Sequence, residues 1–297
     1  MANIYSYRDA NIRKTYLIFT IFLIVIIGLG FVFSQIYGNS LILVVAVIFS
    51  VVSSFVSYWY SDKIALSVSG AKPIEKEDAP ELYRTVENLA ITSGLPTPKI
   101  YIVPEVAPNA FATGRDPQHA SIAVTAGLLK MMNKTELEGV IAHELSHVSN
   151  RDILVSSVVV VLVGTISLLA NWLLNSFFWG GINDERDNGP LGLLIGLILA
   201  IVVPIVATII QLAISRKREL LADASGALLT RYPEGLISAL EKIEQTDLPL
   251  RRANSATAHL WLSDPYRGGK SVSWAQKLFM THPPIDERIA ALKKMEG

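Results

Sequence analysis

The chain has 297 residues, of which 51% are apolar and only 18% are charged, and its 26 basic side chains balance its 26 acidic ones. A net charge near zero argues against a polybasic surface, so no nucleic-acid partner is expected. The chain has no cysteine, which excludes thiolate ligands, a cysteine nucleophile and disulfides, so any metal must be held by histidine and carboxylate side chains.

The first two apolar blocks predict a pair of membrane-spanning helices. No charged side chain occurs between Lys14 and Asp62, and the polar sequence SQIYGNS at 34–40 divides this stretch in two. Each half is close to the roughly 20 residues that a spanning helix needs. A cleaved signal peptide is the alternative, but no A-x-A-like site follows the first block and the second block begins at once. We therefore assign residues 15–61 to transmembrane helices 1 and 2.

Residues 62–151 are predicted to form the first segment of a soluble domain. Helical spacing with a Gly-Leu-Pro exit predicts a helix over 78–95. Apolar and β-branched runs predict short strands within three stretches, 99–104, 109–114 and 120–129. Thr135 is followed three residues later by Glu138, a capping-box signature, so the next helix should begin near residue 135.

That helix carries two histidines four positions apart, with a glutamate directly after the first. His143 and His147 project in nearly the same direction, so both imidazoles can reach one Zn²⁺ ion, while Glu144 points beside the metal toward a bound water. Gly139, one turn earlier, is expected to leave the surface above them open. The alternative is a surface helix with two unrelated histidines, although the whole chain has only five.

Two further uncharged blocks predict a second pair of spans. Residues 153–183 and 188–215 are separated only by DERD at 184–187, so we assign residues 152–215 to transmembrane helices 3 and 4. The basic residues beside the four spans all fall on one side: Arg8, Arg13, Lys14, Lys63, Arg151, Arg216, Lys217 and Arg218. That side should be cytoplasmic. It would hold residues 62–151 together with 216–297.

A catalytic zinc site usually has three protein ligands, so a third must be found. The extended motif H-E-x-x-H-x-x-G-x-x-H is excluded, because Asn150 and Ile153 occupy its glycine and histidine positions. On a helix predicted at 218–229, Glu219 and Asp223 could supply a ligand and a partner that orients a ligating imidazole. A solvated acidic face is the alternative. DERD is the other acidic candidate, but the topology places it across the membrane.

Five motifs occur in order across the four apolar blocks: NAFATG (109–114), AHELSH (142–147), NRDIL (150–154), RELLADASGA (218–227) and THPPIDERI (281–289). In these motifs the chain resembles the HtpX-type membrane zinc metalloproteases, within the wider group that includes the CAAX prenyl proteases. With four spans, the resemblance implies a mainly α membrane protein. Its cytoplasmic zincin-like α+β protease domain would be built from two chain segments, and an edge strand of its small sheet could align an extended substrate.

The resemblance also implies roles for particular residues. His143, His147 and Glu219 would ligate one Zn²⁺ per chain, Glu144 would be catalytic, and Asp223 would hold a ligating histidine in place. The implied function is hydrolysis of damaged or misfolded membrane proteins, from the cytoplasmic side of the plasma membrane. The partners would be such substrates and the lipid bilayer.

A further donor should stabilise the oxyanion. His282 is the candidate, because two prolines follow it and the family shows this THPP motif; a turn-stabilising or surface histidine is the alternative. For His119 and His259 a structural role is favoured. Asp152 could support the site, but a helix-end charge at the membrane face needs no function.

Three other functions remain open. An intramembrane protease would bury H-E-x-x-H inside an apolar span, whereas polar sequences flank it here. A prenyl-protein protease shares the site chemistry but usually has more spans. A non-enzymatic membrane protein with a structural zinc would have no need of Glu144.

Overall fold

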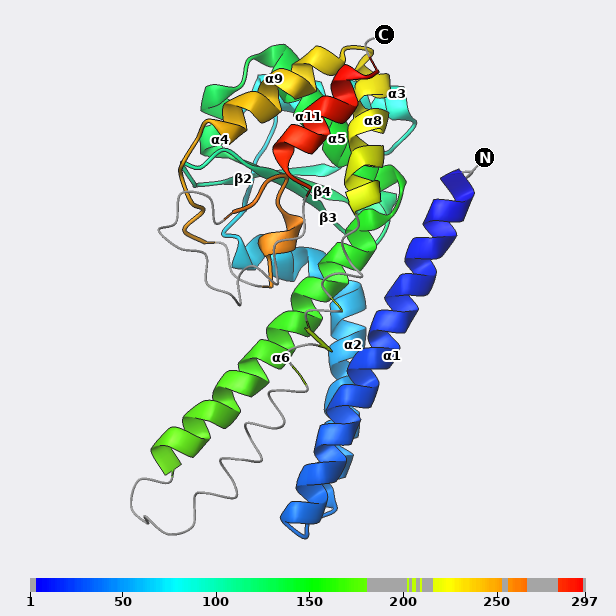
Figure 1. Ribbon diagram of the computed structural model, residues 1–297, viewed down its shortest axis with the longest axis vertical. Helices are drawn as coiled ribbons and strands as arrows, with labels where there is room; N and C mark the ends of the chain where they lie inside the picture. The colour runs from blue at the N-terminus through cyan, green and yellow to red at the C-terminus, as the bar shows by residue number, and fades with distance from the viewer. Residues whose placement is uncertain are drawn as a thin grey trace.

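The computed structural model describes residues 4–180, 216–252, 256–265 and 283–295, together with Val202, Ile205, Val206 and Ile209. Long helices extend from one side of an α/β domain, and the first of them begins beside that domain (Figure 1). Most of the predicted fourth span, the DERD sequence and His282 lie outside the described residues.

Three of the described helices are long and apolar enough to cross a membrane: α1 (Ile4–Ile36), α2 (Leu41–Val68) and α6 (Asp152–Gly180), with candidate spans at Asp9–Ile36, Leu41–Val68 and Asp152–Asn171. Helices α1 and α2 form a hairpin through a turn at 37–40, where Gly38 has a φ of 60°. They extend beyond the predicted 15–61 stretch, because helical hydrogen bonding continues past the apolar block.

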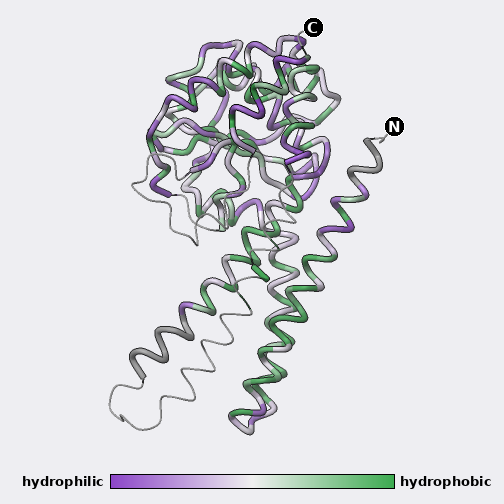
Figure 2. Tube along the Cα trace, viewed as in Figure 1, coloured by the Kyte–Doolittle hydropathy of each residue, from purple (hydrophilic) through white to green (hydrophobic). Residues whose placement is uncertain are grey.

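The residues of these helices are mostly apolar, as Figure 2 shows by the mostly green trace of their coloured parts. Large apolar side chains that a soluble domain would bury are exposed there, among them Ile24, Phe31, Val45, Ile48 and Phe55. A continuous apolar surface of this kind marks contact with another apolar phase. The chain is therefore a membrane protein.

The α/β domain contains a four-stranded sheet of β1 (Lys72–Pro73), β2 (Lys99–Val103), β3 (Ala110–Thr113) and β4 (Ser121–Thr125). The strand order is β1-β2-β4-β3; β2 and β4 are parallel and the other pairs are antiparallel. The three predicted strands are present, but the third ends at Thr125. Its side chain caps α4 (Ala126–Met131) by accepting from the Leu128 N–H, so residues 126–129 are helical and not strand.

Helices cover the sheet and complete the domain. They are α3 (Pro80–Ser93), α5 (Lys134–Ser149), α8 (Arg216–Thr230), α9 (Pro233–Glu244) and α11 (Ile285–Lys293), with short 3₁₀ turns at Pro117–His119 and Ala258–Leu260. The expectation of a mainly helical membrane protein with an α+β domain is confirmed.

The capping box of α5 lies two residues before the predicted one. The Asn133 side chain accepts from the Glu136 N–H, and the Glu136 carboxylate accepts from the Asn133 N–H. Glu136 can occupy this position because Lys242 and Ser238 of α9 also donate to it, at 2.7 and 2.6 Å. Thr135 is only an accessory, since its hydroxyl donates to the Asn133 side chain. The prediction of a Thr135–Glu138 box was wrong for this reason.

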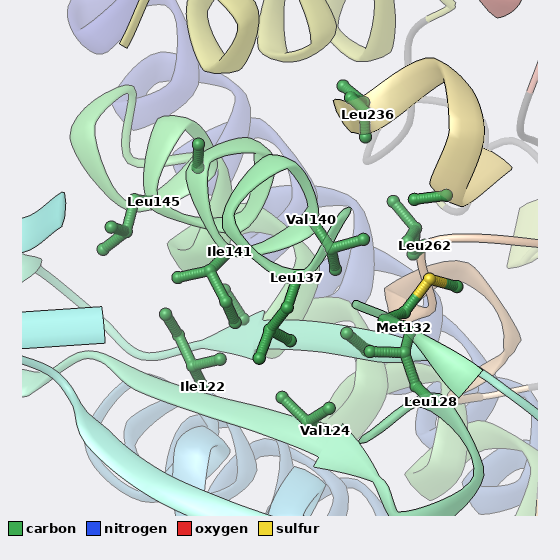
Figure 3. Close-up of a cluster of buried hydrophobic side chains, with 14 of the residues drawn as sticks. Ile122, Val124, Leu128, Met132, Leu137, Val140, Ile141, Leu145, Leu236 and Leu262 are labelled. Atoms are coloured by element: carbon green, nitrogen blue, oxygen red, sulfur yellow. The ribbon is translucent and has the colours of Figure 1, made fainter. Parts of the chain in front are cut away.

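Helix α5 is a core helix. Leu137 and Ile141 lie over Ile122 of the sheet, as Figure 3 shows, and all three are buried. The expectation that Gly139 leaves an open surface was wrong. A Cβ there would lie 2.6 Å from the backbone nitrogen of Leu236. The glycine is needed because α9 packs against α5 by backbone contact.

Candidate metal centre

His143 and His147 on α5 converge with Glu219 on α8. The two Nε2 atoms lie 3.1 Å apart, and they lie 3.8 and 3.7 Å from the Glu219 carboxylate oxygens. Ligand atoms of all three residues fall within 4.8 Å of one another. Two imidazole nitrogens and one carboxylate make a donor set that suits catalytic zinc. The residues present therefore fit the metal that the motif predicts.

The sequence of α8 explains how Glu219 reaches the histidines. Glu219, Asp223 and Gly226 are spaced i, i+4 and i+7, which places them on one helix face. A Cβ at Gly226 would lie 2.9 Å from the backbone nitrogen of His143. Because glycine has no Cβ, α8 packs directly on the turn of α5 that carries this histidine.

A buried ion pair fixes the ring of His143. Its Nδ1 lies 2.8 Å from Asp223, and Asp223 accepts from Nε and Nη2 of Arg288 at 2.8 and 2.6 Å. Burial would raise the pKa of Asp223, but the Arg288 charge and hydrogen bonds lower it to about 2. Burial also lowers the pKa of His143, despite Asp223. A neutral imidazole that donates from Nδ1 presents its Nε2 lone pair to a metal.

A second carboxylate holds His147. Asp152, at the start of α6, lies 3.0 Å from Nδ1 of His147 and accepts from Arg218 at 3.1 Å. Burial alone would lower the pKa of His147, but the Glu219 charge and the Asp152 hydrogen bond outweigh it and raise the pKa to about 9. Asp152 is thus part of the site, beyond its expected position at a helix end.

Glu144 is buried beside the three converging side chains. Desolvation raises its pKa to about 7, Glu219 adds to the increase, and the charge of His147 opposes it. Glu144 lines a cavity of about 30 Å³ together with Ala112, His147, Glu219 and His259. A cavity of that volume can hold a water molecule. A carboxyl group with a near-neutral pKa next to such a space is suited to proton transfer.

A structural role was favoured for His119 and His259, and each has a hydrogen-bonding partner outside the three converging side chains. His119 is on the surface, where its Nδ1 lies 2.6 Å from Asp116. Nε2 of His259 lies 2.9 Å from the Ser156 carbonyl, although the residue also lines the cavity.

Sequence reasoning missed Arg288. Its motif, IDERIAALKK, reads as a solvated charged helix, yet the side chain is fully buried. The one available signal was its position in the last of the five family motifs.

The chain is similar to known proteases over nearly its whole length. The family described as Peptidase family M48 matches residues 76–296. A relative named Protease HtpX homolog from Thermoanaerobacter pseudethanolicus is 48% identical over 298 residues, covering 98% of each chain. Proteins of the same name from Tropheryma whipplei (strain Twist) and Pyrococcus furiosus are each 45% identical, with 98% and 91% of both chains covered.

A solved structure is also similar. The crystal structure of S. mikatae Ste24p has a TM-score of 0.48 and 20% sequence identity, and the match covers 94% of this chain and 61% of that one. The chain thus spans about three fifths of the length of Ste24p.

The pKa of His147 predicts how metal binding depends on pH. Below about pH 9 a metal ion that binds Nε2 must displace a proton from this residue. We expect the apparent zinc affinity to rise about tenfold per pH unit from pH 7 and to level off above pH 9. Calorimetry in buffers of different ionisation enthalpy counts the released protons. Asp152→Asn should move the plateau to lower pH, and an affinity that does not change between pH 7 and 9 would contradict the assignment.

Arg288→Met should leave the Asp223 carboxylate buried without its cation. We expect the free energy of unfolding to fall by about 3–5 kcal/mol, the usual cost of breaking a buried pair. The matched control is Lys293→Met in the same helix, because Lys293 pairs with Glu241 on the surface, and such pairs contribute about 0–1 kcal/mol. Urea unfolding in detergent micelles compares the two variants. Equal free energies of unfolding would mean that the buried pair contributes no more to stability than the surface pair.

Proposed function

Because the chain belongs to peptidase family M48 and is a membrane-bound metalloprotease, we propose that its metal is zinc and that it hydrolyses damaged or misfolded membrane proteins. We further propose four spans, with the active site on the cytoplasmic side of the plasma membrane. The single observation that carries the zinc proposal is the convergence of His143, His147 and Glu219 on one point beside buried Glu144.

The chain's own residues divide the work of hydrolysis. His143, His147 and Glu219 would hold the ion, and the carboxylates of Asp223 and Asp152 keep the imidazoles turned toward it. Bound zinc would polarise the scissile carbonyl and acidify a water molecule. Glu144 takes the proton from that water and passes it to the departing amine, so no covalent intermediate with the protein is needed. A structural zinc would leave the position of Glu144 unexplained.

Strand β3 is the proposed guide for an extended substrate. It lies at the edge of the sheet, and its Ala112 lines the cavity beside Glu144. The Ala110 carbonyl already accepts from the Leu262 N–H at 2.9 Å. Backbone pairing with a substrate would therefore centre on Ala112, because the Gly114 N–H further along already donates to the Ser157 hydroxyl at 3.1 Å.

His282 is the residue that we propose as the oxyanion donor. Arg288, the nearest buried cation to His143 among the described residues, is already engaged by Asp223 and by the Leu262 carbonyl at 2.8 Å. A separate side chain is thus needed opposite the metal.

Glu144→Gln should retain one zinc ion per chain and lose hydrolysis, because the three ligands remain while the proton acceptor is gone. Glu219→Ala should lose zinc on dialysis and also lose activity, since two histidines alone bind the ion more weakly. Metal analysis and cleavage of unfolded casein, with and without a chelator, measure both quantities. Normal turnover in Glu144→Gln, or full zinc content in Glu219→Ala, would refute the corresponding role.

The proposed topology can be tested with single cysteines, because the chain contains none of its own. Gln35→Cys lies at the end of α1 before the turn and should react with an impermeant thiol reagent added to intact cells. Glu77→Cys lies in the α/β domain and should react only after lysis. Both positions are exposed in the fold. The reverse pattern of labelling would place the metal centre outside the cytoplasm.

A further inference from the structure

Between Asn11 and Ile26, one face of α1 is buried at regular spacing. Its residues are Asn11, Thr15, Ile18, Phe22 and Ile26. The apolar members pack against α6, including Val155 and Val158. Asn11 is the one amide in this stripe, and only 2% of its surface is exposed. Burying an amide costs free energy unless its hydrogen bonds are made, so the contacts of Asn11 show what it does there.

All the polar atoms of the Asn11 side chain are engaged near the metal centre. Its Nδ2 donates to Asp152 Oδ1 at 2.7 Å and to the Asn150 carbonyl at 2.9 Å. Its Oδ1 accepts from Nη1 of Arg218 at 3.3 Å. These partners fix the orientation of the amide, because the flipped form would set its oxygen against two acceptors and its nitrogen against a cation.

The contact continues from Asp152 to a proposed metal ligand. Asp152 Oδ1 takes the bonds from Asn11 and Arg218, which leaves Oδ2 to face Nδ1 of His147 at 3.0 Å. With one oxygen held by two donors, the carboxylate cannot rotate freely. The ring of His147 therefore keeps the orientation in which Nε2 faces His143 and Glu219.

We propose that Asn11 is a positioning residue, through which the first membrane helix orients His147 by way of Asp152 and so sets the affinity for the metal. This inference rests on the proposed zinc site. It extends the machinery beyond residues 76–296, the part of the chain that the family match covers. Helix α1 then has a role besides anchoring, since it contributes to the support of the catalytic centre.

The test measures zinc dissociation constants by competition with a fluorescent chelator, with no use of activity. Asn11→Ala should weaken zinc binding about 3–10-fold, somewhat less than the 10–100-fold typical of a group bonded directly to a ligating histidine. Asn11→Asp keeps the shape of the side chain but faces Asp152 with a carboxylate. Asn11→Asp should weaken zinc binding at least as much, and it provides a second test if Asn11→Ala fails to fold.

Two comparisons separate positioning from general packing. Thr15→Val is the matched control, because Thr15 is buried one turn later on the same stripe and, among the residues that the structure describes, its hydroxyl bonds only the Asn11 backbone carbonyl. It should leave the zinc affinity unchanged. In an Asp152→Ala background, Asn11→Ala should have no further effect, since the two residues act in series.

The outcomes distinguish this inference from the proposed function. Wild-type protein that binds no zinc would remove the metal site itself. Zinc-binding wild type with an Asn11→Ala variant of equal affinity would overturn the positioning role, as would fully additive losses in the double variant.

Discussion

The direct packing of α8 on α5 is the contact on which the candidate metal centre depends. Two histidines on one helix turn are supplied by local sequence alone, but the carboxylate must come from another helix at a fixed depth and rotation. Gly226 sets that depth, because the backbone of α8 meets the backbone of His143 where any larger residue would collide. The i, i+4 and i+7 spacing then presents Glu219 and Asp223 to the two imidazoles. A buried glycine thus determines the geometry of side chains one and two turns away.

Each imidazole is supported in the same way, by an aspartate that is itself held by an arginine. His143 is followed by Asp223 and Arg288, and His147 by Asp152 and Arg218. The physical reason is the cost of placing a carboxylate in a poorly solvated interior, which falls when a cation shares its oxygens. The two series of contacts differ in the place of their arginine. Arg288 is wholly enclosed in the α/β domain, whereas Arg218 reaches the amide of a membrane helix.

Sequence patterns predicted the parts of this structure that repeat along the chain or are local to one helix. Apolar block length identified the spans that the structure describes, and the i, i+4 histidines identified α5. Glu219 was proposed as the third ligand because it lies one turn from Asp223 on a predicted helix and because the topology set DERD across the membrane; the structure brings it to the two histidines. Patterns failed where a partner from elsewhere decides the outcome. Asn133 displaced Thr135 as the cap because α9 supplies Lys242 and Ser238. Gly139 was expected to leave an open surface and Arg288 belongs to a charged helix pattern, because neither pattern shows the distant residues that pack on them.

The separation of the proposed ligands by the long apolar helix α6 gives the site an order of assembly. His147 precedes α6, and Glu219 lies beyond α6, 72 positions after His147. At roughly 5–20 residues per second, a ribosome makes the histidines about 4–14 s before the glutamate. During that interval the nascent protein has the two histidines of α5 but not yet Glu219. The proposed three-ligand site is therefore complete only after the intervening segment has been synthesised and α8 has docked on α5, so translation itself sets when the donor set comes together.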